Sequence, residues 1–219
     1  MSRVTIIGGH GKVALLTAPL LTADGHDVTS VVRNPEQVGD IEATGATAAV
    51  LDVENASTEQ IAELVLGSDV VVWAAGAGGG DPKRTYAVDR DAAIRSMDAS
   101  VSAGVGHYVI VSYFGAGPDH GVPEDNSFYA YADAKTAADE HLQGTDLAWT
   151  ILRPSGLTLE AATGHIETGE GVQPGTVSRD NVAHVIRSVV SNPDAAARRI
   201  LAFNDGLQPI DEVVAANPA

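Results

Sequence analysis

Tyr131 and Lys135 are the side chains whose types and spacing best suit proton transfer. They stand four positions apart in a stretch with helical periodicity, so they share one face of the predicted helix. A lysine ammonium beside a phenol favours the phenolate, so we expect the pKa of Tyr131 to fall from about 10 toward a working range. Ser112, at the end of a predicted strand, is expected to hydrogen-bond the same substrate oxygen. Tyr113 and Tyr129 are close enough in sequence to be alternatives to Tyr131.

A glycine-rich turn near the N-terminus has the features of a phosphate-binding site. Residues 8–14 read Gly-Gly-His-Gly-Lys-Val-Ala, between a predicted strand and a predicted helix. Gly8 would allow the tight turn, Gly11 would let the backbone approach a pyrophosphate, and Ala14 would allow close helix–strand packing. The N–H groups and the dipole of the helix N-terminus would then bind the negative charge. An ordinary strand–helix turn is the alternative. The predicted phosphate-binding residues are Gly8, His10, Gly11, Lys12 and Val13.

Strand ends further along the chain extend this prediction to a dinucleotide. Arg33 follows the predicted strand 28–32, where an acidic residue favours NAD(H) and an arginine favours the 2′-phosphate of NADP(H). We therefore expect NADP(H) to be favoured over NAD(H); a surface arginine is the alternative. Asp52, with Val53 after it, follows the third predicted strand and is expected to accept a hydrogen bond from the adenine amino group, unless it serves as a helix cap or turn residue. The small residues after the fourth strand, which would let a dinucleotide lie against the backbone, are Ala74, Ala75 and Gly76.

The elements that must position these residues alternate along the chain. Near-continuous β-branched runs indicate strands buried on both faces, which are typical of a parallel sheet. The predicted strands are 4–7, 28–32, 48–51, 70–73, 108–111, 148–152 and 199–203. Between them, helical spacing predicts helices over 13–22, 58–66, 85–103 and 129–142. This alternation predicts an α/β fold with a doubly wound parallel sheet of the Rossmann type.

The last third of the chain is predicted to add a small substrate-covering segment. Residues 153–175 are rich in Gly, Pro and Thr and are expected to be mostly loop, followed by a helix from Ser178 or Asp180 to Val190. A short helix is expected between 209 and 216. We therefore predict one domain over 1–219, with a core over 1–152 and a small C-terminal cap and final strand over 153–219.

Composition excludes several classes of protein. The net charge of −16 argues against nucleic-acid binding, which depends on cations that neutralise phosphates. No cysteine is present, and the histidines lack metal-ligand spacing, so we expect no disulfide and no metal site. With no leader-like or membrane-spanning apolar run, we expect a cytoplasmic protein without membrane contact. Oligomeric state is not predicted.

Taken together, these residues resemble the atypical NAD(P)H-binding branch of the short-chain dehydrogenase/reductase superfamily. The resemblance covers nearly the whole chain; it rests on the turn at 8–12, Arg33, the segments 51–53 and 74–76, Val111-Ser112, the stretch 131–135, 152–154 and 178–183. It implies that Ser112, Tyr131 and Lys135 match the superfamily's catalytic Ser-Tyr-Lys set, and that Pro154, Gly156 and Leu157 line the nicotinamide side of the groove.

The predicted function is that of an NADPH-dependent oxidoreductase acting on a small carbonyl or other reducible organic substrate. Tyr131 would supply a proton, Ser112 would orient the substrate oxygen, and Lys135 would bind the nicotinamide ribose. The alternative is a non-catalytic redox sensor, because many atypical members bind the cofactor but vary or lose the catalytic tyrosine. A sugar-nucleotide epimerase or dehydratase is less favoured, since it would need a larger C-terminal region.

Overall fold

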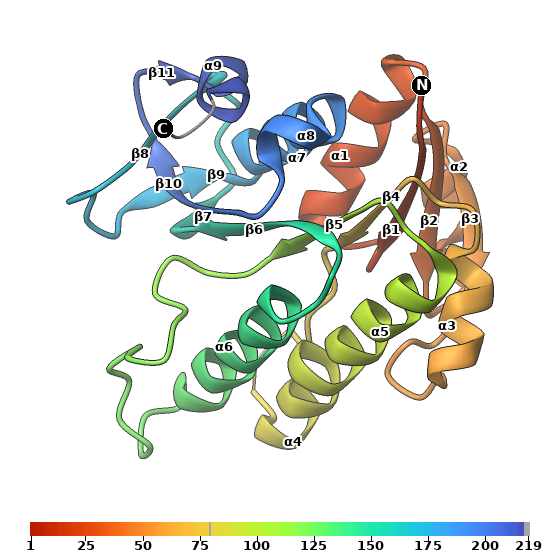
Figure 1. Cartoon of the computed structure of the whole chain (residues 1–219), viewed down its shortest axis with the longest axis horizontal. Coiled ribbons are helices and arrows are strands. Elements are labelled where there is room, and N and C mark those ends of the chain that lie inside the picture. The colour runs from red at the N-terminus through yellow and green to blue at the C-terminus, as the bar shows by residue number, and fades with distance from the viewer. Residues whose placement is uncertain (79, 217–219) are drawn as a thin grey trace.

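The central sheet is built from strands with apolar, mostly β-branched sequences. The structure, a computed structural model, describes residues 1–78 and 80–216. Nine strands of this described part form one sheet: β1 (Arg3–Ile7), β2 (Asp27–Val32), β3 (Thr47–Val50), β4 (Val70–Trp73), β5 (His107–Val111), β6 (Ala148–Pro154), β8 (His165–Thr168), β10 (Arg199–Asp205) and β11 (Gln208–Pro209). Their order is β11-β8-β10-β6-β5-β4-β1-β2-β3 (Figure 1).

The arrangement of these strands confirms the predicted doubly wound fold. Strands β1 to β6 and β10 pair in parallel, and β8 runs antiparallel to β10 and β11. The order 3-2-1-4-5-6 reverses its direction between β1 and β4, and ligands bind such sheets beyond the strand C-termini at that point. The glycine turn after β1 and the small residues after β4 therefore flank the expected ligand crevice.

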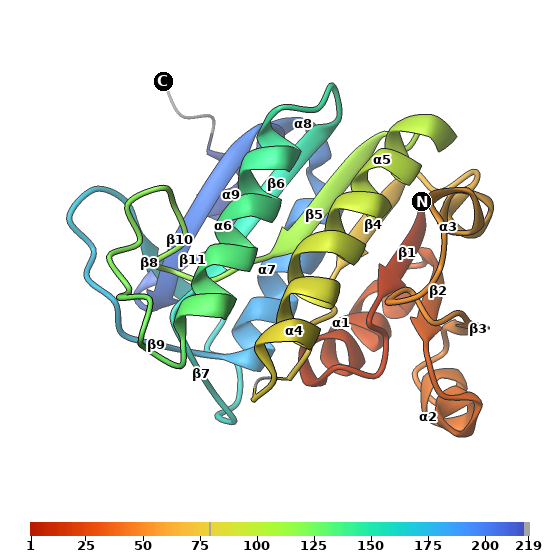
Figure 2. The ribbon, with the colours of Figure 1, turned by 90° about the horizontal axis from the view of Figure 1, so that it is seen from below.

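Helices cover both faces of the sheet, as Figures 1 and 2 show. One face carries α1 (Lys12–Ala23), α2 (Val38–Glu42), α7 (Arg179–Ser191), α8 (Pro193–Ala196) and α9 (Ile210–Ala215); the short 3-10 helix η1 (Pro35–Gln37) precedes α2. The other face carries α3 (Thr58–Val65), α4 (Pro82–Thr85), α5 (Ala93–Ala103) and α6 (Tyr129–Gln143). Alternate strand residues supply the two cores: Val72 packs under the first set and Trp73 under the second. Among the described residues, no helix combines the length and apolarity needed to cross a membrane.

The segment predicted as one helix over 85–103 consists of three parts. It comprises α4, the π-helical segment η2 (Tyr86–Ala92) and α5. Asp81 caps α4 by accepting from the Lys83 N–H at 3.0 Å. The wider π turn lies at Asp89, whose carboxylate is buried against the loop after β4. π turns of this kind are frequent at functional sites.

The region after β6 contains more regular structure than the sequence predicted. Residues 153–175 are mostly loop, as expected, but three segments are strand: β6 continues to Pro154, β7 spans Gly156–Thr158, and β8 spans His165–Thr168. Strand β7 pairs with β9 (Thr176–Ser178) in a separate two-stranded sheet. These strands were missed because their partners lie far along the chain, and short pairings of this kind leave no periodic pattern.

A buried histidine joins β5 to β6 beneath α8. The His107 Nε2 lies 2.8 Å from the Thr150 hydroxyl, which itself donates to the Ala196 carbonyl at 2.8 Å. Since the hydroxyl proton is used, the imidazole must donate from Nε2. Burial lowers the pKa of His107 to about 4, and the negative charge of Asp194 acts in the opposite direction.

We expect this histidine to make folding stability pH-dependent. In the unfolded chain His107 takes up a proton near pH 6.5, whereas in the native state it does so only near pH 4. The contribution of His107 to the free energy of unfolding should therefore be fully present above pH 6.5. It should fall by up to about 3 kcal/mol as the pH drops to about 4. The measurement is urea unfolding across this range for the wild type and His107→Gln, which removes this titration. Equal pH slopes in the two proteins would contradict the assignment.

Candidate functional site

The glycine turn after β1 packs between the ends of β2 and β4, the strands on either side of β1. Gly8 has φ +87°, and a Cβ there would lie 2.6 Å from the Ala75 Cα after β4. A Cβ on Gly9 would lie 2.7 Å from the Ser30 Cβ of β2, and the Gly9 N–H donates to the Val31 carbonyl at 2.8 Å. The prediction named Gly8 but missed Gly9, because contacts with β2 cannot be seen in the local sequence.

The N-terminus of α1 opens onto a groove. Gly11 is the N-cap, and no side chain caps the first turn. A cavity of about 670 Å³ is lined by Gly11, Lys12 and Val13, and a second of about 310 Å³ is lined by Gly8, His10 and Gly11. Both cavities share Gly11 and the segment Ala74-Ala75-Gly76, so they form one continuous groove. The uncapped amides at the start of α1, between these two parts of the groove, suit the central pyrophosphate of a dinucleotide.

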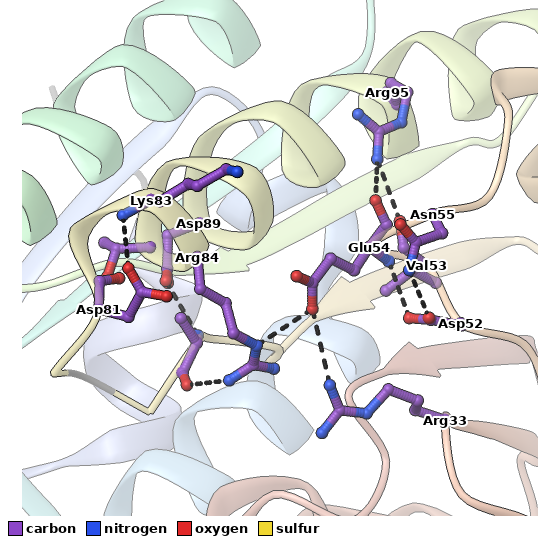
Figure 3. Close-up of polar contacts among 12 residues, drawn as sticks. Arg33, Asp52, Val53, Glu54, Asn55, Asp81, Lys83, Arg84, Asp89 and Arg95 are labelled. Atoms are coloured by element: carbon purple, nitrogen blue, oxygen red, sulfur yellow. Dashed lines mark hydrogen bonds and ion pairs between the residues drawn. The ribbon is translucent and has the colours of Figure 1, made fainter.

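Three charged residues meet at the smaller end of this groove (Figure 3). The Glu54 carboxylate lies 3.1 Å from the Arg84 Nε and 3.6 Å from an Arg33 nitrogen. Arg84 also donates to the Ala77 carbonyl. The sequence predicted Arg33 at this position, with no acidic residue directly at the end of its strand. In the structure Glu54, from the loop after β3, and Arg84, from α4, lie next to Arg33. No local pattern connects these two residues, which are 30 positions apart.

Asp52 and His10 line the same end but are already hydrogen-bonded. Asp52 accepts from the Asn55 side chain at 2.7 Å and from the Glu54 N–H at 3.3 Å, as Figure 3 shows. The Nε2 of His10 lies 2.8 Å from Asp40, and its Nδ1 lies 3.0 Å from the Gln37 amide. Asp52 therefore stabilises the turn after β3 while its side chain also lines the groove, with Val53 beside it.

A buried ion pair lies at the centre of the groove. The Lys135 ammonium is 3.2 Å from an Asp89 oxygen, and both side chains are almost fully buried. Lys135 also donates to the Val111 carbonyl of β5 at 3.0 Å, and Asp89 accepts from the Ala77 N–H at 3.0 Å. The sequence prediction did not include Asp89, although helical spacing could have indicated it. Asp89 lies on the same helix face as four buried residues that follow it by three, four, seven and eight positions: Ala92, Ala93, Ser96 and Met97.

A second buried carboxylate, Asp139, holds Ser112. The Ser112 hydroxyl donates to Asp139 at 2.9 Å, and Arg153 donates to the same oxygen at 3.0 Å. Asp139 lies four residues after Lys135 on the buried face of α6, so helical spacing could have revealed it. The Ser112 proton is therefore directed at Asp139, although Ser112 lines the same cavity as Tyr131 and Lys135.

The expected direction of the Tyr131 pKa shift is wrong. Burial raises the pKa of Tyr131 above its usual value, and Asp89 and Asp139 add to this effect. Lys135 acts in the opposite direction, but its ammonium lies 5.8 Å from the centre of the Tyr131 ring and is paired with Asp89. Desolvation therefore outweighs the lysine, and the neutral phenol is the stable form.

An apolar cavity of about 530 Å³ continues from the centre of the groove. Pro154, Gly156 and Leu157, which the resemblance assigned to the nicotinamide side, all line this cavity. Leu157 also lines the larger part of the groove, together with Ser112 and Tyr131. The groove and this cavity thus meet at the residues expected to perform the chemistry.

Comparison with known proteins agrees with this geometry. A family model described as NAD(P)H-binding matches residues 8–193. The chain belongs to this NAD(P)H-binding family. A UPF0659 protein of Schizosaccharomyces pombe is 34% identical over 98% of this chain and 94% of its own length. A Bacillus subtilis protein named as an uncharacterized sugar epimerase is 32% identical over 97% of this chain and 98% of its own length.

Solved structures show the same fold. A protein described as an NAD-dependent epimerase/dehydratase of Bacillus halodurans has a TM-score of 0.89 at 28% identity, over 98% of this chain and 99% of that one. An anaerobillin reductase of Escherichia coli O157:H7 has a TM-score of 0.77 at 23% identity, over 95% of this chain and all of that one. The resemblance to atypical NAD(P)H-binding proteins is therefore confirmed at the level of family and fold.

The glycine turn provides a matched test of the groove. Gly8 and Gly25 have similar φ values of +87° and +82°, but a Cβ on Gly25 meets nothing within 4 Å. Gly25→Ala should cost only left-handed backbone strain, about 1–2 kcal/mol. Gly8→Ala adds the collision with Ala75, so it should cost more and abolish dinucleotide binding. Urea unfolding and fluorescence titration with NADPH measure both effects; equal losses in the two variants would contradict the close approach.

Proposed function

We propose that this protein is an NADPH-dependent reductase of a small carbonyl or other reducible organic substrate. The supporting observation is that Ser112, Tyr131 and Lys135 line the larger part of the groove, which also includes the start of α1 at the glycine turn. A bound NADPH would supply hydride to the substrate carbon. The first-turn amides of α1, with Gly8, His10, Gly11, Lys12 and Val13, would bind the phosphates, while Ala74, Ala75 and Gly76 would contact the dinucleotide.

The chain's own residues would handle the proton. Tyr131, neutral because its pKa is raised, would donate a proton to the substrate oxygen. Ser112 would orient that oxygen after its hydroxyl turns from Asp139, and Arg153 would remain to compensate the Asp139 carboxylate. Lys135, held by Asp89 and Val111, would hold the nicotinamide ribose. A raised pKa keeps Tyr131 protonated and therefore available as a donor, whereas removal of a proton from an alcohol would need the phenolate.

The preference for NADPH is supported by the two arginines at the smaller end of the groove. Arg33 and Arg84 together carry two positive charges around the single Glu54 carboxylate. A 2′-phosphate would accept hydrogen bonds from both guanidinium groups in place of Glu54. Asp52 and Val53 would contact the adenine at the adjoining wall, and Pro154, Gly156 and Leu157 would line the nicotinamide end.

One observation favours a different function, that of an NADP(H)-binding sensor without turnover. The Ser112 proton and the Lys135 charge are both already engaged by buried aspartates. A sensor would bind NADPH tightly and consume none with any substrate. Turnover assays therefore distinguish the two functions, and an epimerase would differ from both by converting a sugar without net consumption of NADPH.

The first test is the role of Tyr131. Tyr131→Phe should lower kcat by about 10²- to 10⁴-fold, because proton donation is lost. The matched control is Tyr129→Phe, on the same helix but packed against His120, which should retain wild-type turnover. Since the Tyr131 phenol stays neutral, the wild-type kcat should be flat from about pH 6 to about pH 9. NADPH oxidation is followed with a panel of quinones and carbonyls; unchanged turnover in Tyr131→Phe would contradict the proposed proton donor.

The second test is cofactor choice. Arg33→Gln and Arg84→Gln should each weaken NADPH binding by about tenfold and leave NADH binding within about twofold, since only NADPH carries the 2′-phosphate. Glu54→Gln should act in the opposite direction and strengthen NADPH binding. Fluorescence titration measures the dissociation constants. Wild-type protein that binds NADH as tightly as NADPH would contradict the preference.

A further inference from the structure

The apolar cavity beside the groove has a chemically distinct lining. Three aromatic rings form a cluster along it: Tyr113 with Phe128 at 5.3 Å, Tyr113 with Tyr131 at 5.5 Å, and Phe128 with Tyr131 at 5.2 Å between ring centres. Phe114, two prolines and Leu157 complete the apolar wall. Such a wall and a volume of about 530 Å³ suit a ligand with one or more planar rings.

Two of these side chains expose apolar area where the cavity meets the groove. Phe128 is 43% exposed and Leu157 is 38% exposed, and both line the cavity as well as the groove. Neighbouring exposed apolar groups around a hollow mark a binding surface rather than ordinary surface variation. A ring bound between them would bury this area.

The cavity is also unusual in its charge. The protein has 29 acidic and 13 basic residues, excluding histidine. Yet among the described residues that line this cavity there is one cation, Arg179, and no carboxylate. Arg179 begins α7 and donates through one terminal nitrogen to the carbonyls of Leu157 and Thr158 at 3.0 and 2.8 Å.

These two carbonyls anchor Arg179 without neutralising it. Its guanidinium has five N–H donors, and the two carbonyl contacts use one nitrogen. Within residues 1–78 and 80–216 it forms no ion pair. Asp180, the next residue, accepts from the Ala162 N–H. A guanidinium fixed in this way is ready to bind a carboxylate with its remaining donors.

We infer that the substrate is a planar, ring-containing molecule with an acidic group, whose ring packs on Phe128 and Tyr113 and whose carboxylate pairs with Arg179. The inference rests on the proposed reductase function, because Ser112 and Tyr131 stand where this cavity meets the groove. The reducible group then lies toward Tyr131, and the acidic group lies at α7. Because Arg179 also lines the groove, a phosphate of the cofactor is the alternative ligand for it. Lys12, beside the glycine turn, already provides a cation for the cofactor phosphates, so Arg179 is not needed there.

The test uses two probes of the same shape, the anionic 2-naphthoate and the neutral 2-naphthamide. Calorimetry measures their binding to NADPH-saturated protein, and NADPH binding itself is measured separately. Wild-type protein should bind the acid about tenfold more tightly than the amide. Arg179→Gln should remove this difference and leave amide binding within about twofold, while Arg179→Lys should restore part of it. Phe128→Ala should weaken both probes by a similar factor, because it removes ring contact and no charge.

The control is Arg198→Gln, an exposed arginine outside both cavities that should change neither affinity. Equal binding of acid and amide to the wild type would overturn the inference. So would an Arg179→Gln variant that loses NADPH affinity but keeps its preference for the acid, since Arg179 would then bind the cofactor. If NADPH does not bind, the proposed function fails. The two probes are then titrated into cofactor-free protein, and their relative affinities show whether the cavity still prefers an acidic ring compound.

Discussion

The buried carboxylate of Asp89 is the group on which the centre of the site depends. It accepts from the Ala77 N–H in the loop after β4 and pairs with Lys135 of α6, which in turn donates to the Val111 carbonyl of β5. A charge buried to this extent is tolerable only when it is paired, and removing one partner typically costs about 3–5 kcal/mol. Two strand ends, the π turn and α6 are therefore held in one relative position, with the groove between them.

A second buried carboxylate repeats this arrangement on α6, four residues after Lys135. Asp139 is compensated by Arg153 and also accepts the Ser112 proton. Burial raises the pKa of Asp139, while Arg153 and Ser112 counteract this shift. The phenol of Tyr131 thus lies near one cation and two carboxylates in a poorly solvated site, and its pKa rises. This environment maintains a proton donor, which is a different use of the Tyr-x-x-x-Lys pair from the phenolate that the spacing suggested.

The groove and its adjoining cavity differ in chemistry along their length. The end near β2 and β3 is polar, with Glu54 between two arginines. The centre consists of open backbone amides and small residues that allow close approach, as at Gly8. The other end is aromatic, and Arg179 lines both this end and the groove. A protein with a net charge of −16 thus concentrates several of its few cations where anionic groups would bind.

The sequence by itself determined the seven parallel strands of the sheet, the longer helices that cover it and the glycine turn, because β-branched runs, helical spacing and glycine requirements are local properties. It also identified Tyr131, Lys135 and Ser112 as candidates, since spacing along a helix and position at a strand end can be read directly. Only the tertiary structure decided what surrounds them. Glu54 meets Arg84, and Ser112 meets Asp139, across gaps of about 30 residues that carry no local signal. The direction of the Tyr131 pKa shift was likewise decided by the tertiary structure. Desolvation depends on all the groups packed around the phenol, and the spacing between two residues does not reveal it.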